Sequence, residues 1–127
     1  MSNATLEQLS PYVMPGLVAE IKGDADTEEV IKEICFCYNV DPEVFHKKLK
    51  SNERRFVVLR QVYFYVMRRY SNFSLMKIGN TLNKDHATVI YSVKQVETAL
   101  KFKYKDFYPI VIRIERNLSI KFRKYEH

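Results

Sequence analysis

The chain has 127 residues, a net charge of +6 and 46% hydrophobic residues, which fits one soluble globular domain rather than two. Three glycines and four prolines are too few for a fibrous or disordered chain, and no apolar run approaches the length of a membrane span. Because no secretory signal is visible, we expect a cytoplasmic protein in which Cys35 and Cys37 are reduced and serve as small hydrophobic residues.

Charge is distributed unevenly along the chain. Residues 44–105 carry fourteen lysines and arginines against three acidic residues, a net charge of +11, whereas residues 1–29 carry one against six, a net charge of −5. A basic segment beside an acidic one is typical of a protein that binds a polyanion such as nucleic acid. A solvated basic face would give the same count, so charge alone leaves both explanations open.

Helices account for every element that the sequence predicts. Residues 1–26 form an N-terminal arm and acidic linker with at most one short helical piece, because proline and glycine are frequent there. Apolar residues at helical spacing then predict a first helix over about 27–39, capped by Asp26 or Thr27. A short second helix begins at Asp41-Pro42, and a basic, polar loop follows it.

A long helix from about Arg54 to Tyr70 carries the broadest apolar face, so we expect it to be the central and most buried helix. The run Tyr63-Phe64-Tyr65 lies in the middle of this helix, where the three rings point in different directions. Packing in the core and partly at the surface therefore explains the run better than a platform on which bases stack. The predicted apolar face consists of Phe56, Leu59, Val62, Tyr63, Val66 and Met67.

Three further helices are predicted in the rest of the chain. Together the predicted elements indicate an all-α fold, a helical bundle that contains a helix-turn-helix and has an additional C-terminal helix. Ser74 caps a short helix over Leu75–Leu82, and Asp85 caps a long one that runs to about Lys105. A last helix over about 107–123 either caps the bundle, which is the default, or presents a dimer face. The predicted inner residues are Val89, Ile90, Val93, Val96 and Leu100 in the long helix, and Ile110, Val111, Ile114 and Leu118 in the last one.

The short and long helices joined by Asn83-Lys84 have the form of a helix-turn-helix. Gly79 lies late in the first of them, where a small residue lets the second helix pack closely. In this motif the second helix lies in the major groove of DNA, and its N-terminal residues reach base edges. The first-turn residues here can hydrogen-bond bases or phosphates, or pack on a thymine methyl group: Asp85, His86, Ala87 and Thr88.

Two spaced motifs resemble the C-terminal DNA-binding domain of the bacterial chromosomal replication initiator, the DnaA family. They are Ser74-Leu75-x-x-Ile78-Gly79 and Lys84-Asp85-His86-Ala87-Thr88-Val89, with Arg60-Gln61 at the matching distance upstream. The resemblance covers roughly residues 27–104. It implies sequence-specific binding of double-stranded DNA in replication initiation or its regulation, with residues 27–105 as the DNA-binding domain and 106–127 as a C-terminal helical extension.

The resemblance also implies a role for each matching residue. Asp85, His86, Ala87 and Thr88 would read the major groove, and Lys84 would contact backbone or bases. Arg60 and Gln61 would hold phosphates, and the basic loop would approach the minor groove. Three further residues join this set without matching the family's motif. Lys50 and Arg54 could replace the family's minor-groove arginine, because Asn52 occupies its position. Arg68 is added from its charge and its position on the long helix.

The sequence departs from the family at three further points. The turn is one residue shorter, and Ala87 replaces a threonine. None of the three glycines belongs to a phosphate-cradling loop, so we expect no nucleotide site, whether the chain is a cut domain or a free-standing protein. Cys35 and Cys37 lack the further ligands of a zinc site, and no arrangement of catalytic residues is indicated, so we expect no metal, no cofactor and no enzymatic activity. The alternative function is a protein-interaction module that keeps the helix-turn-helix fold without reading DNA. Oligomeric state is not indicated.

Overall fold

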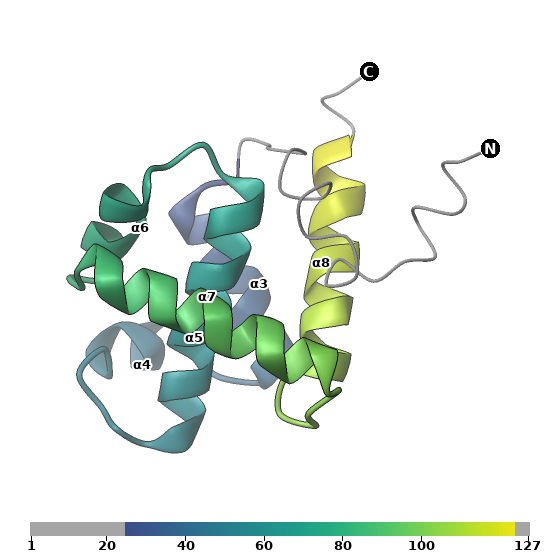
Figure 1. Ribbon diagram of the computed structural model, residues 1–127, viewed down its shortest axis with the longest axis horizontal. Helices are drawn as coiled ribbons and strands as arrows, with labels where there is room; N and C mark the ends of the chain where they lie inside the picture. The colour runs from purple at the N-terminus through teal and green to yellow at the C-terminus, as the bar shows by residue number, and fades with distance from the viewer. Residues whose placement is uncertain (1–24, 124–127) are drawn as a thin grey trace.

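The computed structural model describes the backbone of residues 25–123 and the side chains as far as Leu118. Every element in this part is a helix, which confirms the all-α class (Figure 1). Most of residues 5–26, where a short helical piece was expected, lies outside the described residues. The helices in chain order are α3 (Thr27–Tyr38), α4 (Pro42–Lys47), α5 (Arg54–Tyr70), α6 (Leu75–Thr81), α7 (His86–Lys101) and α8 (Tyr108–Arg123).

Short polar side chains fix the starts of four helices. The carboxylate of Asp26 accepts a hydrogen bond from the backbone N–H of Glu29 at 2.8 Å, so Asp26 rather than Thr27 caps α3. Asp41, Ser74 and Asp85 cap α4, α6 and α7 in the same way. Each cap satisfies a backbone donor that the helix leaves unpaired, which is why the predicted starts agree with the structure.

The end of α7 differs from the prediction. The helix stops at Lys101 instead of about Lys105, because Lys103 adopts the left-handed conformation with φ of 56°. The backbone N–H of Tyr104 then donates back to the carbonyl of Ala99 at 2.9 Å, which satisfies a carbonyl that the helix leaves free. No glycine marks this termination, so helical periodicity overestimates the length of α7.

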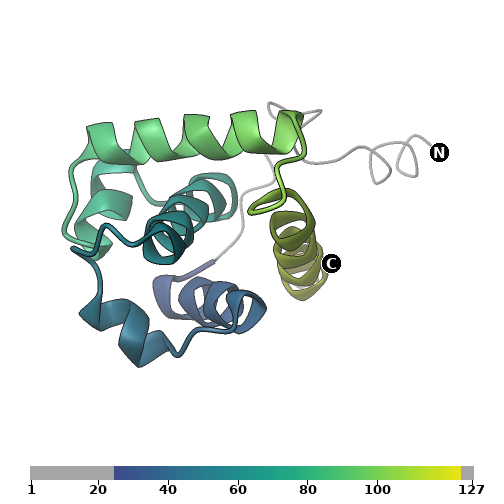
Figure 2. The ribbon, with the colours of Figure 1, turned by 90° about the horizontal axis from the view of Figure 1, so that it is seen from below.

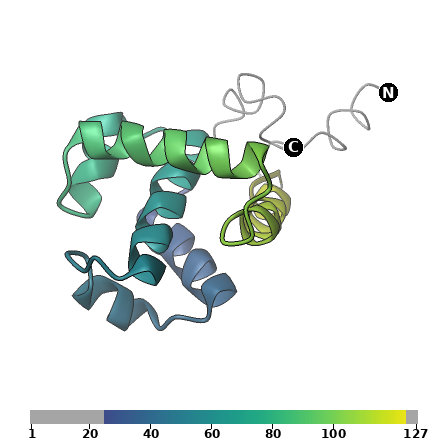
Figure 3. The same ribbon diagram turned by 60° about the horizontal axis from the view of Figure 1, so that its bottom comes forward.

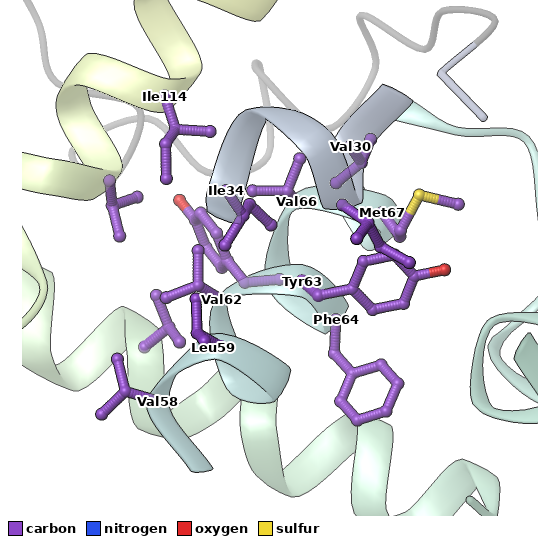
Figure 4. Packing of buried hydrophobic residues seen from close by; sticks show 14 of the residues in the cluster. Val30, Ile34, Val58, Leu59, Val62, Tyr63, Phe64, Val66, Met67 and Ile114 are labelled. Carbon is purple, nitrogen blue, oxygen red and sulfur yellow. The ribbon is translucent and has the colours of Figure 1, made fainter. Parts of the chain in front are cut away.

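The core is built around α5, which contacts α3, α6 and α7 (Figures 2 and 3). All six residues of its predicted apolar face are buried. Tyr63, Phe64 and Tyr65 are each at most 1% exposed, so all three rings lie in the core rather than partly at the surface, and none is open to a base. Figure 4 shows Tyr63 and Phe64 among the buried residues. The hydroxyl of Tyr63 keeps a polar partner there, because it lies 2.7 Å from the hydroxyl of Thr81.

Helix α8 closes the bundle on the side of α3. Val111, Ile114 and Leu118 are at most 1% exposed and join the same hydrophobic core as α5, while Ile110 is half-buried. The apolar stripe predicted for the last helix is therefore covered within this chain. The core continues across the domain boundary expected at 105–106, which itself stays a prediction.

A buried ion pair also links α8 to α5. Arg69 and Glu115 are 4% and 1% exposed, and Nη1 of Arg69 lies 3.3 Å from Oε2 of Glu115. The hydroxyl of Tyr70 donates to the same carboxylate at 3.2 Å, and Arg69 also donates to the hydroxyl of Tyr65. Burial nevertheless raises the pKa of Glu115 to about 7, because the cost of desolvating the carboxylate exceeds the stabilisation by Arg69 and Tyr70.

The close packing of α6 on α7 depends on Gly79. A Cβ atom at this position would lie 2.5 Å from the carbonyl oxygen of Lys84, a distance that such atoms do not tolerate. The backbone N–H of Lys84 donates to the carbonyl of Gly79 at 2.9 Å, so the turn folds directly over the glycine. Within the turn Asn83 has φ of 62°, a left-handed conformation that asparagine adopts more readily than most residues.

We expect Gly79→Ala to lower the free energy of unfolding by about 1–3 kcal/mol, because the new methyl group collides with backbone rather than with a flexible side chain. Urea denaturation measures the effect. Asn80→Ala is the control, since Asn80 is exposed on the same helix. Equal stability of the Gly79 variant and the wild type would contradict the close approach.

A second prediction concerns pH. Because the folded-state pKa of Glu115 is raised to about 7, the carboxyl group stabilises the fold most at low pH, and this contribution is lost as pH rises through 7. Relative to Glu115→Gln, the wild type should lose about 2 kcal/mol of unfolding free energy between pH 5 and pH 8. Urea denaturation at both pH values tests this. A pH-independent difference between the two proteins would contradict it.

Candidate nucleic-acid interface

The N-terminus of α7 presents the predicted base-reading residues. His86 and Ala87 are exposed and Thr88 is half-buried. Asp85 Oδ1 accepts the backbone N–H of Thr88 at 2.8 Å, and hydrogen bonds from Thr88 lower the pKa of Asp85. Asp85 thus fixes the start of α7 in addition to any contact with DNA, and the first turn projects His86 and Ala87 into solvent.

The outward face of α7 extends beyond its first turn. Val89, Val96 and Leu100 are buried, and they set the inner direction of the helix. Ile90 is 37% exposed and Tyr91 is 59% exposed, so the prediction that Ile90 faces inward is wrong. With Ala87 and the exposed Lys94, these two residues follow the i, i+3, i+4, i+7 spacing of one helical face, a signal already present in the sequence.

A basic hollow of about 270 Å³ lies between the loop after α4 and the turn between α6 and α7. Lys50, predicted from the basic loop, and Lys84, predicted from the helix-turn-helix motif, line it together. Figure 2 shows how the loop after α4 approaches the turn at the left of the view. His46, which no sequence motif singled out, is among the basic residues here. The full lining is His46, Lys47, Leu49, Lys50, Leu82, Asn83 and Lys84.

Arg60 shapes the loop that forms one wall of this hollow. Its guanidinium group donates to the carbonyl of Lys48 at 3.1 Å and to that of Ser51 at 2.7 Å. Arg60 is half-buried, and burial lowers its pKa. Two of its five N–H donors are thereby used inside the protein, which leaves at most three for the predicted phosphate contact.

The other predicted residues of α5 lie apart from the hollow's lining. Arg54 pairs with Asp106, with 3.2 Å between Nη2 and Oδ2, and its guanidinium carbon lies 5.7 Å from the ring centroid of Phe107. Gln61 is half-buried and Arg68 is exposed. The structure therefore brings Lys50 and Lys84 together but directs Arg54 toward the connection between α7 and α8.

The two cysteines differ in exposure. Cys35 is buried and Cys37 is half-buried, and burial raises the pKa of each to about 11, which favours the neutral thiol. Within residues that the structure describes, no group of three potential metal ligands comes together. The helices described here also include none that is long and apolar enough to cross a bilayer.

Residues 27–96 match the family model described as the bacterial DnaA protein helix-turn-helix. The chain belongs to this family. It is 32% identical over 114 residues to the chromosomal replication initiator protein DnaA of Bacteroides thetaiotaomicron, covering 89% of this chain and 24% of that relative. The DnaA protein of Gloeobacter violaceus is also 32% identical, over 96 residues, covering 73% of this chain and 20% of that relative.

The chain thus spans about a quarter or less of the length of these DnaA relatives. The matched segment begins with α3 and ends within α7, so it includes α6, the turn and the first turn of α7. The family resemblance drawn from the two sequence motifs is confirmed.

We expect Arg60→Lys to loosen the basic loop although it keeps the positive charge, because one ammonium group does not reproduce the two-pronged contact with Lys48 and Ser51. The amides of Ser51 and Glu53, which are hydrogen-bonded within this loop, should exchange about fivefold faster. Hydrogen exchange measured by NMR tests this, with Arg68→Lys as the control on the same helix. Unchanged exchange in the Arg60 variant would contradict it.

Proposed function

We propose that this protein binds double-stranded DNA at a specific short site, in replication initiation or its regulation. The observation that carries the proposal is the DnaA-type helix-turn-helix, whose second helix presents an exposed, capped first turn beside a basic hollow. The named relatives are chromosomal replication initiators, which supports the replication context.

In this proposal the first turn of α7 enters the major groove. His86 and Thr88 supply hydrogen-bonding groups to base edges, and the methyl group of Ala87 packs on thymine. Ile90 and Tyr91 extend the contact along the same groove, since both are exposed on the outward face of α7. Ile90 adds an apolar side chain and Tyr91 adds a hydroxyl group. The N-terminus of α7 adds a favourable dipole toward a phosphate.

The basic residues supply affinity that depends little on sequence. Lys50 and Lys84 approach the sugar-phosphate backbone from the two sides of the hollow, with His46 and Lys47 beside them. Arg60 keeps the loop in place and directs its remaining donors to phosphate, with Gln61 and Arg68 as further contacts on the same helix. Arg54 is left out of this set, because it pairs with Asp106 at the connection between α7 and α8. Because phosphate contacts release counterions, affinity should fall steeply as salt rises.

Fluorescence anisotropy of the protein with two labelled duplexes over a salt series tests this function. One duplex carries the family's binding box and the other a scrambled box. We expect tighter binding to the box, and we expect His86→Ala to weaken box binding about tenfold while binding to the scrambled duplex changes little.

Thr98→Ala is the matched control, because Thr98 is exposed on the same helix but lies three turns beyond His86. Equal, salt-sensitive binding to both duplexes would overturn specific reading and leave non-specific DNA binding. Failure to bind either duplex at low salt would overturn the proposal and support the alternative, a protein-interaction module.

A further inference from the structure

Exposed aromatic rings and lysines alternate where α7 ends and the connection to α8 begins. The sequence here is Lys101-Phe102-Lys103-Tyr104-Lys105, named below the 101–105 cluster. Phe102 is 60% exposed and Tyr104 is 52% exposed, although large apolar rings are ordinarily covered. The two rings stack on each other, with centroids 6.1 Å apart and planes inclined by 23°.

The backbone holds this pair of rings in place. Tyr104 donates its N–H to the carbonyl of Ala99 at 2.9 Å, and its own carbonyl accepts from Tyr108 at 2.8 Å. Lys103 takes the left-handed conformation that turns the chain between the two rings. Because the two rings are already ordered in the free protein, less conformational entropy is lost when a ligand stacks on them.

Positive charge surrounds the pair. Nζ of Lys101 lies 5.7 Å from the centroid of the Phe102 ring, and Nζ of Lys103 lies 5.6 Å from the centroid of the Tyr108 ring. Lys103 and Lys105 are both exposed and flank Tyr104 in the sequence. The nearest acidic residue in sequence, Asp106, is already paired with Arg54 at 3.2 Å. Among the described residues no salt bridge joins these three lysines to a carboxylate, so the cluster combines flat apolar faces with positive charge.

The cluster lies away from the proposed duplex-binding surface. It occupies the opposite end of α7 from His86, separated by a 16-residue helix that is roughly 24 Å long, as Figure 2 shows along its upper edge. It also lies outside residues 27–96, which match the family model. The helix-turn-helix accordingly does not account for it.

We propose that the 101–105 cluster binds single-stranded nucleic acid. Unpaired bases stack on the faces of Phe102 and Tyr104, and the lysines hold the adjacent phosphates, which is the combination that single-strand binding sites use. A duplex does not fit this surface in the same way, because its base faces are covered by neighbouring base pairs. An acidic peptide would satisfy the lysines without using both ring faces.

Anisotropy of the 127-residue protein with a labelled twelve-residue oligothymidine tests the proposal. We expect the double variant Phe102→Ala/Tyr104→Ala to bind the oligothymidine at least fivefold more weakly. An abasic strand of the same length carries the same charge without bases, so its affinity should be lower and unaffected by the double variant. Phe36→Ala is the matched control, since Phe36 is 71% exposed outside the cluster, with Arg113 near its ring.

Thermal unfolding of each variant verifies that the fold is intact, and binding to the box duplex is measured in parallel. Loss of oligothymidine binding with duplex binding retained supports a separate single-strand site, whether or not the duplex is read specifically. Unchanged binding in the double variant, or an equal loss in Phe36→Ala, overturns the proposal. If the double variant loses binding to phosphatidylglycerol vesicles but keeps its binding to the oligothymidine, the surface binds lipid and the proposal is overturned.

Discussion

Helix α5 has to be buried on nearly all sides, and the packing of the surrounding helices follows from this. From Phe56 to Tyr70 this helix carries apolar residues on most of its circumference, so other helices must cover it on several sides. α3, α6 and α7 do so, and α8 completes the cover through α3 and the pair of Arg69 and Glu115. Eleven residues of α5 are buried. The remaining polar side chains of α5 can reach solvent only through the gaps between the helices that cover it.

This constraint determines how the candidate interface is assembled. Arg60 emerges where α5 is not covered and meets the loop after α4, so the same helix that organises the core also holds one wall of the basic hollow. The other wall is the turn that Gly79 allows to fold tightly between α6 and α7. A recognition helix packed on a rigid core can present its first turn in one orientation, which specific base contacts require.

Helix α7 carries two different surfaces at its two ends. Near its start, which Asp85 caps, the side chains of the first helical turn face solvent. Polar side chains placed in this way are suited to the edges of paired bases. Near its end, Lys103 takes the left-handed conformation that glycine usually adopts at this position, and the stacked rings of Phe102 and Tyr104 are exposed among lysines. Such rings are suited to the faces of unpaired bases. The two surfaces differ because hydrogen-bonding edges and stacking faces demand different side chains.

The sequence was enough to predict the helix starts and the helix-turn-helix, because those depend on neighbours within a few residues. Asp41, Ser74 and Asp85 cap the helices that follow them, and Asp26 was one of two candidates for the first cap. The sequence also determined the buried face of α5, since apolar spacing is local. The folded structure was needed to show that Ile90 faces outward, that Arg54 pairs with Asp106 and that Lys50 and Lys84 line one hollow with His46. Those outcomes depend on how helices pack, and residues distant in sequence then compete for the same space and the same charges.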